Sequence, residues 1–210
     1  MKRCLAILAV LAVALMATAA AAQDTGLVGK GFKLGLAMYT FGGDDTEFEG
    51  VSPGTRMGLG AGGFLTFALG PNLALQPELL YVQKGAKYEE GDASVTFKLD
   101  YLDIPVLLKY RFPTEGSIRP NLFAGPVGSI KMSADMQLES GGDEASVDMS
   151  DGVKGFDFGV ALGGGLDFAL SSSTLAFDVR YTLGMTDWPD TDVSGSVKNN
   201  GWLVTLGVGF

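Results

Sequence analysis

The closing segment of the chain, Trp202-Leu-Val-Thr-Leu-Gly-Val-Gly-Phe210, has the alternating pattern of a β-strand. Every second side chain in it is large and apolar; these are Trp202, Val204, Leu206, Val208 and Phe210. Three of the four residues between them are glycine or threonine. Because successive side chains of a strand point to opposite faces, one face is bulky and apolar and the other is small or polar.

The same alternation recurs along the chain and predicts seven further strands. Their ranges are 30–41, 56–69, 73–88, 95–112, 119–138, 153–169 and 174–187, which together with 202–210 make eight. A helical period is hard to find, and no run of 18 uncharged apolar residues follows residue 22. The sequence therefore predicts an all-β protein.

The two faces of these strands differ in a way that separates a membrane barrel from a soluble sandwich. The bulky apolar face suits lipid, whereas the other face mixes glycine with isolated charges. The isolated charges are Lys33, Arg56, Glu78, Lys84, Asp103, Lys109, Arg111, Lys131, Asp157, Asp167, Asp178 and Arg180. A narrow barrel interior needs small residues and charges that pair with one another. The candidates for such ion pairs in the lumen are Glu78, Asp103, Lys109, Arg111, Asp157, Asp167, Asp178 and Arg180.

The connections between the predicted strands alternate in length. Short ones lie at 70–72, 113–118 and 171–173, and longer ones at 42–55, 139–152 and 188–200, with an intermediate one at 89–94. Short periplasmic turns that alternate with longer outer loops are typical of outer-membrane barrels. The prediction is an eight-stranded up-and-down antiparallel transmembrane β-barrel with both chain ends on the periplasmic side.

The first 22 residues form a separate segment. Lys2 and Arg3 precede an uncharged stretch, Cys4 to Ala22, that ends in small residues. This is the pattern of a secretory signal peptide, which we expect to be cleaved near Ala22; a retained membrane anchor is the alternative. The domains predicted are thus a signal peptide, 1–22, and an outer-membrane β-barrel domain, 23–210.

Composition excludes several kinds of function. The chain has 210 residues and a net charge of −9, with no basic stripe, so it is a poor nucleic-acid binder. It has no histidine, which removes the commonest general base and metal ligand. The glycine-rich runs 58–63 and 163–165 lack the βαβ context of phosphate loops and fit close packing inside a tight barrel. We expect no enzyme, no catalytic residues and no cofactor or metal.

Some residues leave alternatives open. Most of the 24 acidic residues lie in the outer loops, where solvated loop tips and divalent-cation sites at 43–45 or 142–144 are both possible. Aromatic side chains predict interface girdles, with ligand stacking as the alternative; they are Phe32, Tyr81, Tyr110, Phe112, Trp188, Trp202 and Phe210. Pro77, Pro105 and Pro126 fall inside predicted strands, where we expect bulges or kinks.

Several motifs resemble one known family. The segments LQPELLYVQKG (75–85), YLDIPVLLKY (101–110) and FAGPVG (123–128), with the closing strand that ends in Phe210, are similar to the PorT-like outer-membrane β-barrel domain family. The resemblance implies an eight-stranded outer-membrane barrel of a Gram-negative bacterium with prolines inside its strands. It implies no single activity and no catalytic residues, and type IX secretion involves only some members.

The function predicted from these patterns is that of an integral outer-membrane barrel with a non-catalytic structural, adhesive or envelope-interaction role. A small channel or transporter is the first alternative, and a soluble periplasmic lipocalin-like carrier is the second. The expected partners are outer-membrane lipid and the barrel-insertion machinery, which would recognise Trp202, Val204, Leu206, Val208 and Phe210 as an assembly signal. We expect the lumen to be plugged, since eight strands leave a space that side chains can fill.

Overall fold

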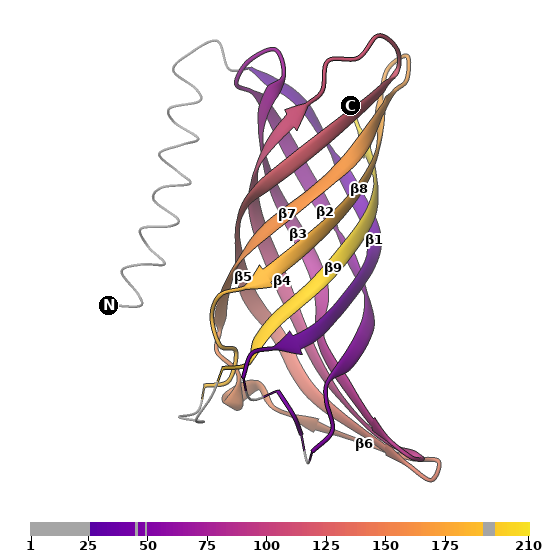
Figure 1. Ribbon diagram of the computed structural model, residues 1–210, viewed down its shortest axis with the longest axis vertical. Helices are drawn as coiled ribbons and strands as arrows, with labels where there is room; N and C mark the ends of the chain where they lie inside the picture. The colour runs from indigo at the N-terminus through magenta and orange to yellow at the C-terminus, as the bar shows by residue number, and fades with distance from the viewer. Residues whose placement is uncertain (1–25, 45, 49, 191–195) are drawn as a thin grey trace, which may run out of the picture.

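The computed structural model describes residues 26–44, 46–48, 50–190 and 196–210, and strands dominate them (Figure 1). The strands are β1 (Leu27–Gly42), β2 (Gly54–Ala68), β3 (Leu73–Glu90), β4 (Ala93–Arg111), β5 (Ile118–Ser140), β6 (Asp143–Asp148), β7 (Phe156–Ala169), β8 (Thr174–Gly184) and β9 (Lys198–Gly209). A single-turn 3₁₀-helix, η1 (Ser150–Gly152), follows β6. Among the described residues, no helix is both long enough and apolar enough to cross a membrane.

Eight of the strands close into a ring. All neighbours pair antiparallel in chain order, with β7 taking the place after β5 because β6 lies outside the ring. The first and last strands meet along a long register that runs from Gly31 opposite Gly209 to Gly42 opposite Lys198. The pairing of β4 with β5 completes the circle. The predicted all-β, eight-stranded up-and-down antiparallel barrel is therefore confirmed.

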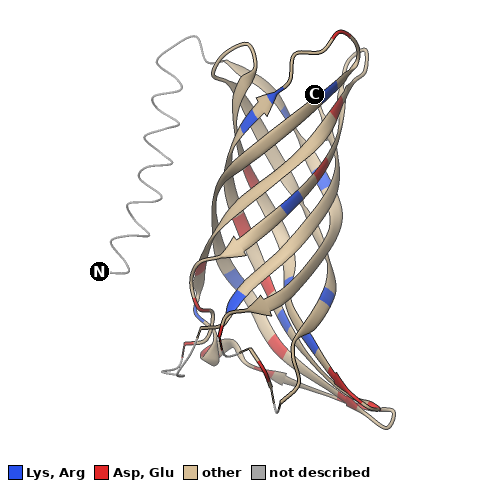
Figure 2. Ribbon diagram, viewed as in Figure 1, with Lys and Arg blue, Asp and Glu red and all other residues tan. Residues whose placement is uncertain are grey.

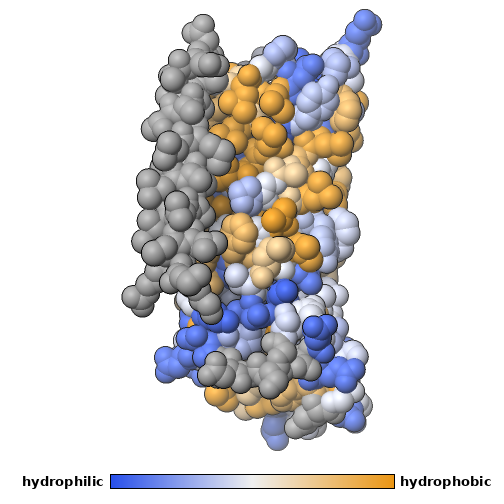
Figure 3. Space-filling model, turned by 60° about the vertical axis from the view of Figure 1, so that its left-hand side comes forward, coloured by the Kyte–Doolittle hydropathy of each residue, from blue (hydrophilic) through white to orange (hydrophobic). Residues whose placement is uncertain are grey.

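The two faces of the wall follow the alternation seen in the sequence. In β9, Leu203 lies on the inner face and is 2% exposed, whereas Leu206 lies on the outer face and is 58% exposed. Other strands repeat this arrangement, and Figure 3 shows hydrophobic residues gathered over the wall on one side of the molecule. An apolar outer band with small and polar residues inside is the arrangement of a transmembrane barrel.

Aromatic pairs mark both edges of this band. Tyr181 and Trp202 stack with their centroids 4.9 Å apart at the edge near the longer loops. At the other edge, Tyr110 contacts Phe112 at 5.2 Å, and Phe32 lies beside Phe210 at 6.3 Å. Such bands are typical of the two membrane interfaces. The girdle prediction is wrong for Trp188, which is buried in the outer end of the lumen.

The short turns lie at the barrel end that also holds Gly26 and Phe210, and we take this end as periplasmic. At the opposite end, β3 to β6 extend beyond the ring as a projecting sheet (Figure 1). Two predicted loops there are wrong: 89–94 contains only a two-residue turn at 91–92, and 139–152 contains β6 and η1. Gly141 and Gly142 both have positive φ, which suits a tight hairpin turn and lets the strands continue to it.

The prolines do not produce the expected bulges. Pro77 pairs with Val106 and Leu80 with Asp103 in one unbroken register, and the strands around Pro105 and Pro126 also keep theirs. The register shifts lie elsewhere, at 27/29, 55/60 and 100/101. Proline has no backbone N–H to donate to the ladder, but its φ fits an extended strand. Each proline therefore costs a ladder hydrogen bond without shifting the register.

Candidate functional site: the charged lumen

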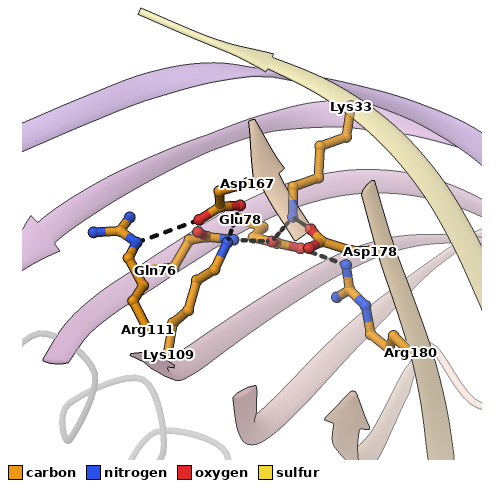
Figure 4. A network of polar contacts seen from close by, with 8 residues as sticks. All are labelled: Lys33, Gln76, Glu78, Lys109, Arg111, Asp167, Asp178 and Arg180. Atoms are coloured by element: carbon orange, nitrogen blue, oxygen red, sulfur yellow. Dashed lines mark hydrogen bonds and ion pairs between the residues drawn. The ribbon is translucent and has the colours of Figure 1, made fainter. Parts of the chain in front are cut away.

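The centre of the lumen holds a network organised around Glu78 of β3 (Figure 4). Lys33 Nζ lies 2.7 Å from Glu78 Oε1 and 2.6 Å from Asp178 Oδ2. Arg180 Nη2 lies 2.7 Å from the second oxygen of Glu78, and the amide of Gln76 donates to the first at 2.7 Å. These side chains come from β1, β3 and β8, so the ion pairs connect strands from different parts of the ring.

A second group of charges lies toward the periplasmic end. Lys109 Nζ is 2.9 Å from Asp167 Oδ1, and Arg111 Nε is 3.3 Å from Asp167 Oδ2. Lys109 and Asp167 are buried, whereas the Arg111 side chain is 29% exposed. Asp167 thus connects the periplasmic ends of β4 and β7.

A third group lies nearer the outer end. Lys84 Nζ is 2.8 Å from Asp103 Oδ1 and 2.9 Å from the Ser129 hydroxyl. The same ammonium lies 5.5 Å from the ring centroid of Tyr39 and 5.0 Å from that of Tyr101. The cation is therefore held by a carboxylate, a hydroxyl and two aromatic faces.

Asp157 departs from the predicted ion pairing. Within the described part of the chain, no cation lies within ion-pair distance of its carboxylate. The Asn199 amide donates to it at 3.0 Å, and the Thr186 hydroxyl donates to its other oxygen. Neutral donors from β9 and the preceding loop therefore satisfy this acid.

Two cations that were expected on the inner face bond to groups outside the three lumen networks. Arg56 lies 3.4 Å from Asp100, beside the half-exposed Tyr81, whose hydroxyl donates to the same carboxylate. Lys131 donates to the backbone carbonyl of Val153 at 2.6 Å, next to the loop that follows β6. The lumen proper then has five cations and five anions, namely Lys33, Lys84, Lys109, Arg111 and Arg180 with Glu78, Asp103, Asp157, Asp167 and Asp178. Figure 2 shows basic and acidic positions interspersed along the strands of the wall.

An aromatic cluster lies across the outer end of the lumen. Phe41 and Trp188 stack at 5.0 Å, and Phe97 contacts both at 5.7 and 6.1 Å. Tyr88 packs against Phe97 and donates to the Thr46 carbonyl at 2.6 Å. This cluster could not be predicted from the alternation of residues, because Trp188 and the segment 46–48 lie between strands, where the sequence has no periodic pattern.

Apolar side chains fill the space between the charged groups. Leu80, Val82 and Leu203 pack with Tyr39 in one cluster, and Leu107, Phe123, Val127 and Ala161 form another. Glycines make room for them: a Cβ added at Gly201 would lie 2.5 Å from Tyr39 Cγ. The glycine-rich inner face is thus used for close packing, as the sequence predicts.

The proposed divalent-cation sites gain no support from the geometry. Among the described residues, no group of three or more acidic, histidine or cysteine side chains is placed to hold an ion. Asp45, part of the first candidate, lies outside the described residues. At the second, Glu144 accepts a hydrogen bond from the Gln137 amide.

A closed antiparallel ring with an apolar outer band and a charged, packed interior defines an outer-membrane β-barrel. The model of the family described as "Outer membrane protein beta-barrel domain" matches residues 21–188, and the chain belongs to this family. It is therefore an integral protein of the outer membrane, in contact with lipid. A comparison with curated protein sequences gives no match.

Solved structures of similar fold include bacterial outer-membrane proteins. Neisserial surface protein A has a TM-score of 0.51 and 16% sequence identity, with 86% of this chain and 95% of that chain covered. The outer membrane protein OprG from Pseudomonas aeruginosa has a TM-score of 0.45 and 14% identity, with 89% and 98% covered. At these identities the likeness concerns the fold alone.

Proposed function

We propose that the protein is a non-catalytic barrel with a closed lumen, which acts through its outer surface in a structural, adhesive or envelope-interaction role. The observation that carries this proposal is the filled interior. Three charged groups, two apolar clusters and an outer aromatic cluster follow one another along the lumen. A space closed in this way supports the shape of the barrel better than the passage of solutes.

The projecting sheet supports a role at the cell surface. Every residue of β6 is exposed, and β6 pairs with β5 alone among the described strands. Val147 and Leu138 add apolar side chains that are 47% and 37% exposed beside acidic ones. An exposed strand edge with mixed apolar and acidic side chains suits contact with another molecule outside the cell.

The remaining sequence-based expectations are part of the same proposal. The leader 1–22 would be removed near Ala22, and an intact-mass measurement of protein from envelopes should then give Gln23 as the first residue. An intact Met1 terminus would contradict this step. The closing strand would be recognised by the barrel-insertion machinery, and the motifs at 75–85 and 101–110 favour a relation to the PorT-like proteins.

The alternatives differ in what they require of the interior. A lipocalin-like carrier needs its bulky apolar face inside and its charges outside, which is the reverse of the faces of β1, β3 and β8. A channel needs a continuous aqueous path past the Glu78 network and the aromatic cluster around Trp188. The absence of histidine supports a non-catalytic role, since it leaves out the commonest general base.

Planar-bilayer recording tests the closed lumen as a function. Purified protein inserted into a bilayer is expected to give little steady current, because buried ion pairs fill the path. A heat-modifiable band on a gel of the same sample serves as the control for folding. Large and reproducible open-channel currents from folded protein would reject the proposal and favour the channel.

A further inference from the structure

A hollow of about 400 Å³ lies inside the periplasmic end of the barrel, next to the turn between β7 and β8. Its polar lining consists mainly of Thr66, Lys33, Gln76, Lys109, Arg111 and Asp167. This volume falls in the range of small-molecule sites. Lys33 and Gln76 of this lining bond to Glu78, and neither Glu78 nor the packed clusters line the hollow, so it ends at the Glu78 network as a blind pocket.

The charges around this hollow do not balance. The hollow is lined by the cations Lys33, Lys109 and Arg111 and by one acidic side chain, Asp167. The Glu78 network and the periplasmic group together contain four cationic and three anionic side chains, namely Lys33, Lys109, Arg111 and Arg180 with Glu78, Asp167 and Asp178. The anion that makes the whole lumen neutral lies nearer the outer end, where one cation, Lys84, faces two acids, Asp103 and Asp157. Positive charge held among low-dielectric walls raises the local concentration of anions.

Arg111 lines this hollow and has donors without a partner among the described residues. Among the described residues, only its Nε makes a hydrogen bond, to Asp167 at 3.3 Å. In Figure 4 the only dashed contact of Arg111 runs to that carboxylate, and its two terminal nitrogens make none. A guanidinium fork presents parallel donors that match the oxygens of a phosphate or carboxylate.

We propose that the hollow is a binding site for a small phosphate-type oxyanion, with Arg111 as the main ligand and Lys109 as a second cation. The anion enters from the periplasm, because the hollow lies within the ring of strands and not on the lipid-facing wall. Asp167 competes with it, since this carboxylate now holds both cations. This gives the closed barrel a ligand on its inner side, which the proposed surface role does not include.

Titration with inorganic phosphate, followed by ³¹P NMR on purified protein in a sugar-based detergent, tests the site. The wild-type protein is expected to bind phosphate saturably, and Arg111→Gln to weaken binding about tenfold or more, because it removes charge-assisted hydrogen bonds. Lys30→Gln is the matched control: it removes one positive charge at the same end of the barrel, from an exposed position beside Phe210. It should leave phosphate binding unchanged.

A second variant is expected to change the phosphate affinity in the opposite direction. Asp167→Asn removes the competing carboxylate and should strengthen phosphate binding, while added phosphate should raise the thermal stability of this variant more than that of the wild type. Absence of saturable binding to the wild type would overturn the site. So would equal affinities for the wild type and Arg111→Gln, or weaker binding by a folded Asp167→Asn variant. A conductance found in the bilayer recording would leave these affinities unaffected, so the two proposals fail separately.

Discussion

Replacement of Glu78 by alanine is expected to cause the largest loss of stability of any single change in the lumen. Lys33, Arg180 and Gln76 all bond to this carboxylate, and both cations are buried. Removing one side of a buried ion pair costs about 3–5 kcal/mol, because the remaining charge is left without compensation. The free energy of unfolding, measured by urea titration of the protein in bilayers or detergent, should fall by this amount.

Two comparisons show whether the position of Glu78 in the network is the reason. Asp178→Ala should cost less, because Lys33 keeps its bond to Glu78 when Asp178 is lost. Asp143→Ala, at the exposed start of β6, should change stability little. If Glu78→Ala were no more harmful than Asp143→Ala, the network would not brace the barrel.

Leu206→Lys is expected to reduce the yield of folded protein in the outer membrane strongly. Leu206 is exposed on the lipid-facing side of β9, near the middle of the apolar band. A lysine at the bilayer midplane of a barrel costs about 2–4 kcal/mol. The same change also interrupts the apolar series from Trp202 to Phe210 that we propose as the assembly signal.

The measurement is the amount of heat-modifiable barrel in washed membranes. Ser171→Lys introduces the same side chain into the exposed periplasmic turn before β8 and should leave the yield at the wild-type level. Equal yields for Leu206→Lys and Ser171→Lys would contradict the facing assigned to β9.

The sequence predicts the fold well because alternation is a local property. Each strand of the ring carries its own pattern, and β9 shows it in nine residues, so the eight strands of the ring and their faces follow from the residues, whereas β6 outside the ring does not. The predicted ends of strands are wrong where pairing with a neighbouring strand, and not the local pattern, determines the end. Asn199 and Asn200 have weak strand propensity, yet both belong to β9, because they continue its ladder with β1.

The partners within the site could not be predicted in this way. Asp178 and Arg180 are two residues apart, yet Asp178 pairs with Lys33 and Arg180 pairs with Glu78, 102 positions away in the sequence. Which charges meet depends on the stagger between the strands of the ring, and the alternation of residues within one strand carries no information about this stagger. The aromatic cluster could not be predicted for a related reason, since Trp188 lies outside the strands and its contact with Phe41 is a tertiary one between residues far apart in the sequence.

The closed lumen is tested most directly by the access of water to its interior. The only cysteine of the chain is Cys4, so single cysteines can be introduced in a background that lacks it. Ala161→Cys places a thiol among Leu107, Phe123 and Val127, at a position that is 0% exposed; Ser172→Cys places one in the exposed periplasmic turn. With a water-soluble maleimide on folded protein in membranes, we predict rapid labelling at 172 and labelling at 161 only after denaturation. Rapid labelling of folded protein at position 161 would contradict the closed lumen.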